Sequence, residues 1–332
     1  MNEILIGLLG ALFATNQVAA TSNVVARATG IRLPVADPAD PTERAYRKLL
    51  ESDEDAHDEV DKWIRENNAF AEKGAGLSAR DLNDKIDQRF EVVLKAYDDF
   101  LRQHPDHARA RLAYGSFLNE SGKDFDAMVQ WERARELDPG NPAAWNNLAD
   151  YYSHRGPVRK SFEYLAKAIE LNPKEPVYYH NLATVVFLFR KDALEQYHLA
   201  DEQQVFRRAL ELYVQARKLD PTNFTLATDL AQTYYYLKPP AASDPKAAAQ
   251  AAGQLVDEGL RAWKDAAKIA PGEVERQGVC IHMARVCVSN QRFAQARTCL
   301  EQVTDPTLAG LRERIEKNLA LKEKETAPPD ER

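Results

Sequence analysis

Apolar residues recur every three or four positions from about residue 42 to about residue 306, which predicts a chain of amphipathic α-helices. Within the first part of this pattern, 42–107, the stretch Gly74-Ala75-Gly76 predicts a break. Ser52 and Ser78 each precede acidic residues, as helix-capping residues do. The pattern therefore predicts an N-terminal helical segment over 42–107, with new helices starting near Ser52 and Ser78.

From residue 108 the pattern repeats, since Pro139 and Pro173 lie 34 residues apart and Gly122 and Gly156 fall in the same register. Small residues at matching positions allow two helices to approach closely, and large residues fill the space between neighbouring helix pairs. Each unit is thus a helical hairpin whose apolar face only a neighbouring unit can bury. The matching positions are Tyr114 with Leu148, Gly115 with Ala149, Trp131 with Leu165, Ala134 with Ala168, and Leu137-Asp138-Pro139 with Leu171-Asn172-Pro173.

The two units, 108–141 and 142–175, resemble the tetratricopeptide repeat (TPR) family, and a weaker resemblance covers about 80–305. A third unit starts at Pro176, a fourth near Phe224, and a degenerate fifth spans 273–306. The resemblance implies an all-α fold: a right-handed TPR-like α-solenoid of antiparallel helix pairs with an N-terminal helical segment.

The repeat array is expected over 108–306, with insertions in the third and fourth units. One insertion is centred on Phe189–Asp201, and the other includes Lys238–Ala252. The polar stretch 307–325 is expected as a C-terminal capping helix, because an open end of such an array needs a polar cover. Residues 326–332 are expected as a disordered tail.

Residues 1–20 allow two interpretations. The apolar run Ile4–Ala14 is too short to span a membrane, and Val18-Ala19-Ala20 resembles a signal-peptidase site, which favours export to a periplasmic or secreted location. Against this, Glu3 is acidic and the first three residues carry no Lys or Arg. The alternative is a short helix packed on the domain or on a membrane surface, in a protein that stays cytoplasmic. Either way, no transmembrane span is expected in the mature chain. Residues 21–41 carry three prolines and are predicted to be a linker.

Charge and motif content argue against several functions. The net charge is −7 and Lys and Arg form no strong cluster, so we expect no nucleic-acid partner. We find no P-loop, dinucleotide-binding or hydrolase motif, so we predict neither an enzyme nor a cofactor. His104 and His107 are separated by Pro105, which favours a turn over a metal site, and the acidic stretch Glu51–Asp55 is interpreted as a solvated helix start.

The three cysteines, Cys280, Cys287 and Cys299, fit no common zinc spacing. They are expected as small apolar residues packed between two helices. A Cys287–Cys299 bridge across a helix pair is the alternative, and their redox state stays open.

The TPR resemblance also implies a binding surface, because the first helix of each hairpin lines the concave side in that family. Residues one or two positions off the packing stripe would point into this groove, where amides, hydroxyls and rings suit an extended peptide. The alternative is that they are simply solvated or covered by the insertions. The predicted groove residues are Asn146, Asp150, Ser153, His154, His180, Thr184, Phe187, Thr228, Gln232 and Tyr235.

We therefore predict a scaffold or adaptor for a protein or peptide partner. The clamp of Lys, Asn and Arg that some TPR proteins use for a chaperone C-terminal carboxylate is not expected. Asn147 matches one clamp Asn, but the other positions hold Leu112, Ser116, Val177 and Asn181, so the lysines and arginine are missing. One alternative is a self-assembling structural protein that stacks through its N-terminal helices or its cap. Another is a small-ligand binder or enzyme with a pocket under the insertions, using His180, His198 and Tyr234–Tyr236.

Overall fold

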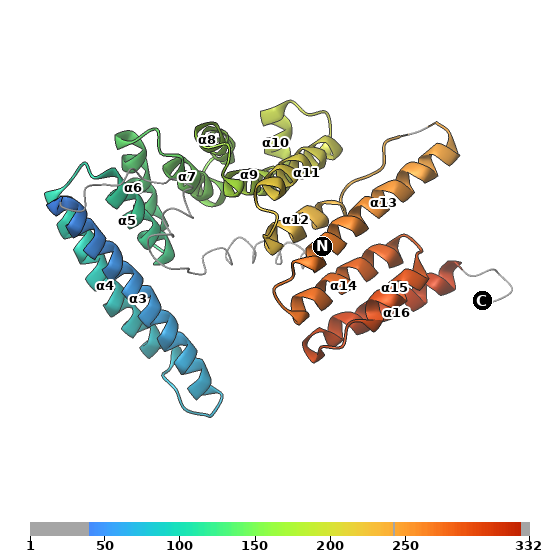
Figure 1. Ribbon diagram of the computed structural model, residues 1–332, viewed down its shortest axis with the longest axis horizontal. Coiled ribbons are helices and arrows are strands. Elements are labelled where there is room, and N and C mark those ends of the chain that lie inside the picture. Colours follow the sequence, from blue (N-terminus) through green and yellow to red (C-terminus); the bar gives the residue numbers. More distant parts are fainter. Residues whose placement is uncertain (1–39, 242, 327–332) are drawn as a thin grey trace. The chain divides into compact units, whose positions relative to one another are not determined.

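The computed structural model describes residues 40–241 and 243–326, which form fourteen α-helices, one 3-10 helix and no strand (Figure 1). The predicted all-α architecture of stacked helix pairs is confirmed. The signal-like segment 1–20 and nearly all of the predicted linker and tail lie outside the described residues. The described chain divides into two compact units, 40–178 and 179–326, which we call the N unit and the C unit.

The N unit consists of three helical hairpins, and each helix packs mainly on the partner that follows or precedes it. The first hairpin is formed by two long helices and the other two by the 34-residue repeats (Figure 1). Their bounds are α3 (Pro41–Ala71), α4 (Ala79–Gln103), α5 (Ala108–Glu120), α6 (Asp124–Leu137), α7 (Pro142–Arg155) and α8 (Val158–Leu171).

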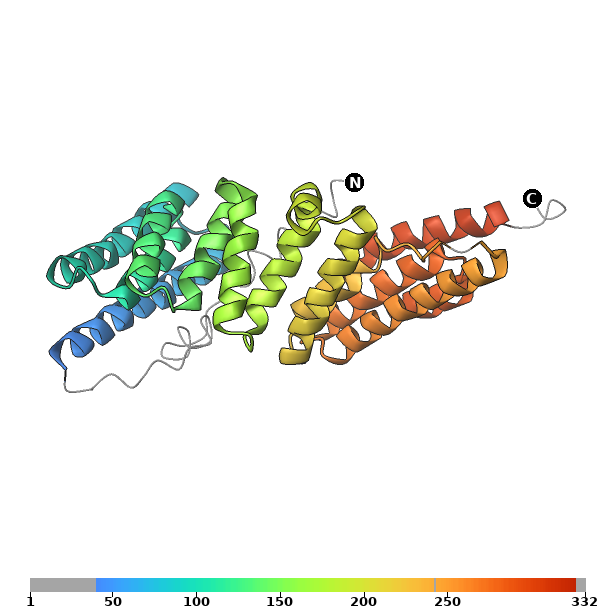
Figure 2. The same ribbon diagram turned by 90° about the horizontal axis from the view of Figure 1, so that it is seen from above.

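The C unit continues the pattern with less regular hairpins. In both views α14 lies beside α13 on one side and against α15 and α16 on the other, and these helices bury a shared apolar core (Figures 1 and 2). The bounds are α9 (Pro176–Leu188, which starts in the N unit), α10 (Arg190–Tyr197), α11 (Glu202–Leu219), α12 (Phe224–Thr233), α13 (Pro245–Lys268), α14 (Glu273–Ser289), α15 (Phe293–Glu301), the 3-10 helix η1 (Pro306–Leu308) and α16 (Ala309–Thr326).

Side chains cap several of these helices. The carboxylate of Asp40 accepts a hydrogen bond from the backbone N–H of Thr42 at the start of α3. Ser78 caps α4 in the same way, as its position in the sequence predicts. Asn141 caps α7 and is followed by Pro142, whose missing N–H leaves no donor unpaired at the first helical position. Short polar residues between the apolar runs therefore set where hairpin helices begin.

The helix start predicted at Ser52 is wrong, because α3 runs without a break from Pro41 to Ala71. Its buried residues Tyr46, Leu49, Ala56 and Val60 keep one helical face on both sides of Ser52. Burial of this continuous face outweighs the local capping tendency of one serine, since packing supplies most of a helix's stability.

Helices also form inside the two predicted insertions. The first contains α10, which ends where His198 adopts a left-handed conformation with φ 52°. In the second, α13 already begins at Pro245, so only residues up to Asp244 form the connection. Tyr235, expected among the groove residues on a first helix, lies beyond the end of that helix: α12 ends at Thr233, and the backbone N–H groups of Tyr235 and Tyr236 bond three residues back, as in a tight turn.

Close helix contact within the second hairpin depends on Gly115 of α5. A Cβ atom added there would lie 2.4 Å from the Trp131 ring of α6. That ring is buried, and its Nε1 donates to the carbonyl of Leu112 over 3.2 Å. The glycine is therefore a packing requirement, which explains the small residues that the repeat carries at this position.

We expect Gly115→Ala to lower the free energy of unfolding by about 2 kcal/mol, since displacing Trp131 costs more than the roughly 1 kcal/mol that alanine gains in a helix. Urea unfolding measures the change. Gly253→Ala in α13 is the control, because no atom lies within 4 Å of the added Cβ, and it should be neutral or slightly stabilising. Equal shifts in the two variants would contradict the packing argument.

Candidate partner-binding surface

Three predicted groove residues lie together at the end of α7 in the N unit. Ser153 Oγ donates to the carbonyl of Asp150 over 2.7 Å and lies 3.0 Å from Nδ1 of His154. The His154 ring nitrogen lies 2.9 Å from the same carbonyl. The side chains of Asp150 and His154 are 50% and 34% exposed, so the cluster is accessible to another molecule, and hydrogen bonds to the Asp150 backbone order Ser153 and His154.

The surroundings of Asp150 make its ionised form less stable than it is in water. Its pKa is raised, first because the protein around it displaces water and second because Asp124 is negative, while His154 acts in the opposite direction. A carboxyl group that is half exposed and still desolvated is surrounded by protein walls. A cation brought by a partner would therefore recover more electrostatic energy here than at a freely solvated carboxylate.

Asn146 lies deeper than predicted for a groove residue. Only 8% of its surface is exposed, and its side-chain amide lies 3.4 Å from that of Asn147. The Asn147 amide in turn lies 3.4 Å from Ser116 Oγ on α5. This chain of side chains connects α7 to α5, so Asn146 contributes to the floor of the surface rather than to its accessible part.

In the C unit, His180 and Thr184 of α9 bond to other helices. His180 Nε2 lies 2.7 Å from Oδ2 of Asp229 on α12, with the two side chains 15% and 6% exposed. Thr184 Oγ1 lies 3.0 Å from the hydroxyl of Tyr213 on α11, and burial raises the pKa of Tyr213. These side chains connect α9 to α11 and α12, so they have a packing role in the free chain.

The remaining predicted residues are also partly or fully covered. Phe187 is 4% exposed, and its ring lies 5.0 Å from that of Tyr236. Thr228 donates to a backbone carbonyl within α12, and Gln232 is half-buried. Tyr235 donates to the carbonyl of His282 on α14 over 3.1 Å. The structure thus places the Phe187 ring against the Tyr236 ring and the Tyr235 hydroxyl against the backbone of α14.

Sequence reasoning missed a charged cluster centred on His57 in α3. Its Nε2 lies 3.3 Å from Asp53 and 3.1 Å from Glu120 of α5, and the ring packs on Phe90 and Phe117. Burial alone would lower the pKa of His57, but the hydrogen bond to Asp53 and the charge of Glu120 outweigh it, and the pKa is raised. The spacing of Asp53 and His57 by four residues was the available signal.

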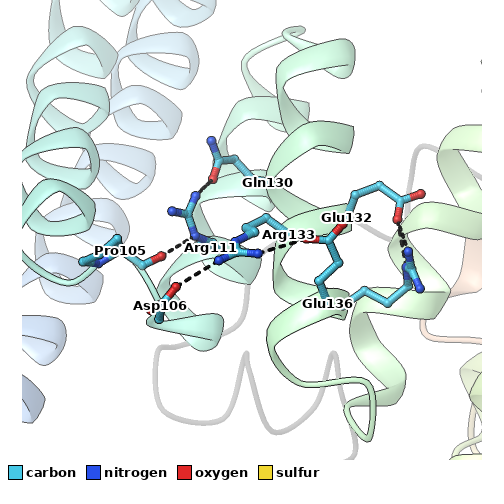
Figure 3. A network of polar contacts seen from close by, with 8 residues as sticks. Pro105, Asp106, Arg111, Gln130, Glu132, Arg133 and Glu136 are labelled. Atoms are coloured by element: carbon cyan, nitrogen blue, oxygen red, sulfur yellow. Dashed lines mark hydrogen bonds and ion pairs between the residues drawn. The ribbon is translucent and has the colours of Figure 1, made fainter.

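A surface network holds the turn between α4 and α5 against α6 (Figure 3). The Arg111 guanidinium donates to the carbonyl of Pro105 and to Oε1 of Gln130, each over 2.8 Å. Arg133 donates to Asp106 over 3.0 Å. The His104–His107 stretch is therefore part of a fixed turn, and His107 itself accepts from the backbone N–H of Ala110 as the cap of α5.

A small cavity of about 240 Å³ in the N unit is a further feature that the sequence did not reveal. The hydroxyl of Tyr114 donates to Asp98 at its wall over 2.9 Å. Three helices contribute its lining: Glu91, Leu94, Asp98, Tyr114, Leu118, Lys123, Asp126, Val129 and Gln130.

Two features are absent from the described residues. Over 40–241 and 243–326, no group of three or more His, Cys, Asp or Glu side chains has an arrangement suited to a metal ion. The helices in the same part of the chain are all too short or too polar to cross a membrane.

Known proteins resemble parts of this chain. The sequence profile of the tetratricopeptide repeat matches residues 142–175. The photosystem I assembly protein Ycf3 of Cuscuta obtusiflora is 26% identical over 147 residues, which cover 42% of this chain and 86% of Ycf3. The ER membrane protein complex subunit 2 of Xenopus tropicalis is 26% identical over 38% of this chain and 41% of its own length. The crystal structure of YrrB, described as a TPR protein with an unusual peptide-binding site, has a TM-score of 0.49 at 14% identity and covers 68% of this chain and 99% of YrrB.

Proposed function

We propose that this chain, whose residues 142–175 match the tetratricopeptide repeat, acts as an adaptor without catalytic activity of its own, which binds a protein or peptide partner on the first helices of its hairpins. Two of the relatives are named for the assembly of a protein complex or for a place in one, which supports a role in bringing proteins together. The absence of a chaperone-tail clamp stays a prediction.

The observation that carries this proposal is the cluster of Asp150, Ser153 and His154 on α7. These side chains are accessible. Hydrogen bonds to the backbone carbonyl of Asp150 hold Ser153 and His154 in place, so a partner would lose little free energy in ordering those two side chains, and the Asp150 carboxylate lies 3.8 Å from His154 Nδ1. Asp150 offers carboxylate oxygens in a desolvated position, which suits a lysine or arginine side chain. We infer a partner that presents a lysine or arginine side chain to Asp150. Backbone amide groups of the same partner would lie within reach of His154.

The self-assembly alternative also has an observation in its favour. At the far end of the α3–α4 hairpin the side chains of Ile64, Phe70 and Leu77 are 36%, 55% and 48% exposed. Exposed apolar residues of this size favour contact with a second apolar surface. Binding experiments therefore need a protein concentration at which static light scattering detects a single species.

A peptide selection tests the adaptor proposal. Random displayed peptides are selected on the purified chain, and the affinity of an enriched peptide is measured by fluorescence anisotropy. We expect enriched peptides to carry lysine or arginine, and Asp150→Asn to weaken binding about 10-fold, since one charge-assisted contact contributes about 1.4 kcal/mol.

Glu163→Gln is the matched control. Glu163 is 49% exposed, as Asp150 is 50% exposed, but it lies on α8, the second helix of the same hairpin, and bonds Arg159 over 3.2 Å. Its substitution should leave the affinity unchanged. Enrichment of acidic peptides, or equal losses in the two variants, would contradict a binding site on α7.

A further inference from the structure

The three cysteines gather on the contact between α14 and α15. Cys280 and Cys287 are seven residues apart on α14, so they share one face of that helix, and Cys299 comes from α15. All three belong to the same buried core, with 8%, 1% and 7% of their surfaces exposed. Each is a free thiol, so the site has the atoms for a disulfide without any further residue.

The thiols differ in their partners. Cys287 directs its thiol to Oε1 of Gln295 on α15 over 3.9 Å. Its pKa is lowered in spite of burial, first by the neighbouring thiol of Cys299 and then by Arg292 and Lys264. The neighbouring Cys287 in turn raises the pKa of Cys299. Cys280 instead directs its thiol to Oε1 of Gln302 over 3.7 Å, and burial raises its pKa. Cys287 is therefore the thiol with the lowered pKa, and the thiol beside it is Cys299.

We propose that Cys287 and Cys299 are a redox-active dithiol pair, which a small-molecule disulfide converts reversibly into an intramolecular disulfide. The Cys287 thiolate attacks one sulfur of the small disulfide and releases one thiolate. The Cys299 thiol then loses its proton to water, attacks the Cys287 sulfur of the mixed disulfide and releases the second thiolate. Two protein thiols are oxidised, one small disulfide is reduced to two thiols, and the two protons leave with these products.

Access to the pair requires a local opening. Cys287 is 1% exposed, so the small disulfide reaches it only when α15 moves away from α14. This helix has nine residues and follows a tight turn, in which Gln291 has φ 57° and the Arg292 N–H bonds the carbonyl of Cys287. We expect oxidation to be slower than for an exposed thiol and to accelerate in mild denaturant. Once formed, the bond would hold α15 to α14.

The test uses the full chain and oxidised glutathione as the probe. Intact mass spectrometry should show the loss of two hydrogens, and peptide mapping should show Cys287 joined to Cys299. The thermal midpoint should rise by a few degrees and return on reduction, because the link restricts the unfolded chain. Recovery of the reduced mass with dithiothreitol checks reversibility.

Serine variants distinguish the proposed Cys287–Cys299 pair from the nearby Cys280. Cys299 also raises the pKa of Cys280, so the two thiols lie close enough to interact. Cys280→Ser should form the link at the wild-type rate, whereas Cys287→Ser and Cys299→Ser should not form it. Cys299→Ser should instead accumulate a mixed disulfide with glutathione at Cys287. Circular dichroism of the reduced variants checks that they fold. A link that contains Cys280, or no mass loss unless the chain is denatured, would overturn the proposal.

Discussion

Trp263→Ala should lower the free energy of unfolding of the C unit by about 4 kcal/mol, the usual scale for removing a buried indole. Trp263 of α13 is 1% exposed. Its ring stacks on His282 of α14, with ring centroids 4.4 Å apart and an angle of 12°, and lies 6.0 Å from the ring of Tyr235 after α12. Three successive segments meet at this one side chain, so the cavity left by alanine would weaken the contacts among all of them.

Guanidinium unfolding measures the total loss, and amide hydrogen exchange locates it. Because neighbouring hairpins stabilise each other mainly through direct contacts, protection should fall first in α12, α13 and α14. Leu321→Ala on α16 is the control, since that side chain is 61% exposed and its removal should change stability by less than about 0.5 kcal/mol. A loss for Trp263→Ala no larger than for this control would exclude the proposed packing role.

The repeat units were predictable because their physics is local. Pro139 and Pro173 follow the second helices of two hairpins, and Gly115 faces Trp131 within one hairpin, so contact partners are close in sequence. A residue pattern with a fixed period then specifies both the helices and their pairing. The same locality explains why the all-α fold was predicted without reference to distant residues.

The errors arose where packing overrides local signals. Ser52 has the surroundings of a helix cap, but the apolar face of α3 continues past it. Tyr234–Tyr236 extend the apolar periodicity of α12, yet the chain turns there so that Tyr236 packs on Phe187 and Phe206. Such contacts join residues from separate helices, and one-dimensional periodicity carries no information about them.

The candidate site also contains residues whose exposure the spacing predicts and residues whose exposure it does not predict. Asp150 and His154 lie on an exposed part of α7, where the spacing alone places them off the packing stripe. Thr184 and Phe187 were selected by the same rule, but Tyr213 and Phe206 of α11 cover them. Whether a polar or aromatic residue off the stripe is accessible depends on side chains from other helices, which the sequence does not position. The groove assignment of these residues stays a prediction.

Acid should destabilise the C unit through His282, which lies against Trp263. Burial first, and the positive charge of Arg285 second, lower the pKa of His282 from 6.5 to about 4. A histidine in the unfolded chain keeps a pKa near 6.5, so the unfolded state binds more protons between these values, and stability must rise with pH across this window. The shift corresponds to about 3 kcal/mol, present above pH 6.5 and lost as the pH falls towards 4.

Urea unfolding of the wild type and of His282→Gln at several pH values isolates this contribution. The difference between the two curves should change by about 3 kcal/mol between pH 6.5 and 4, whatever other groups titrate in both proteins. His57 is a useful contrast: its raised pKa gives stability that is present below pH 6.5 and lost as pH rises through its folded value, so His57→Gln should alter the curve in the opposite direction. Parallel curves for the wild type and His282→Gln would mean that the buried imidazole accepts its proton without loss of packing on Trp263.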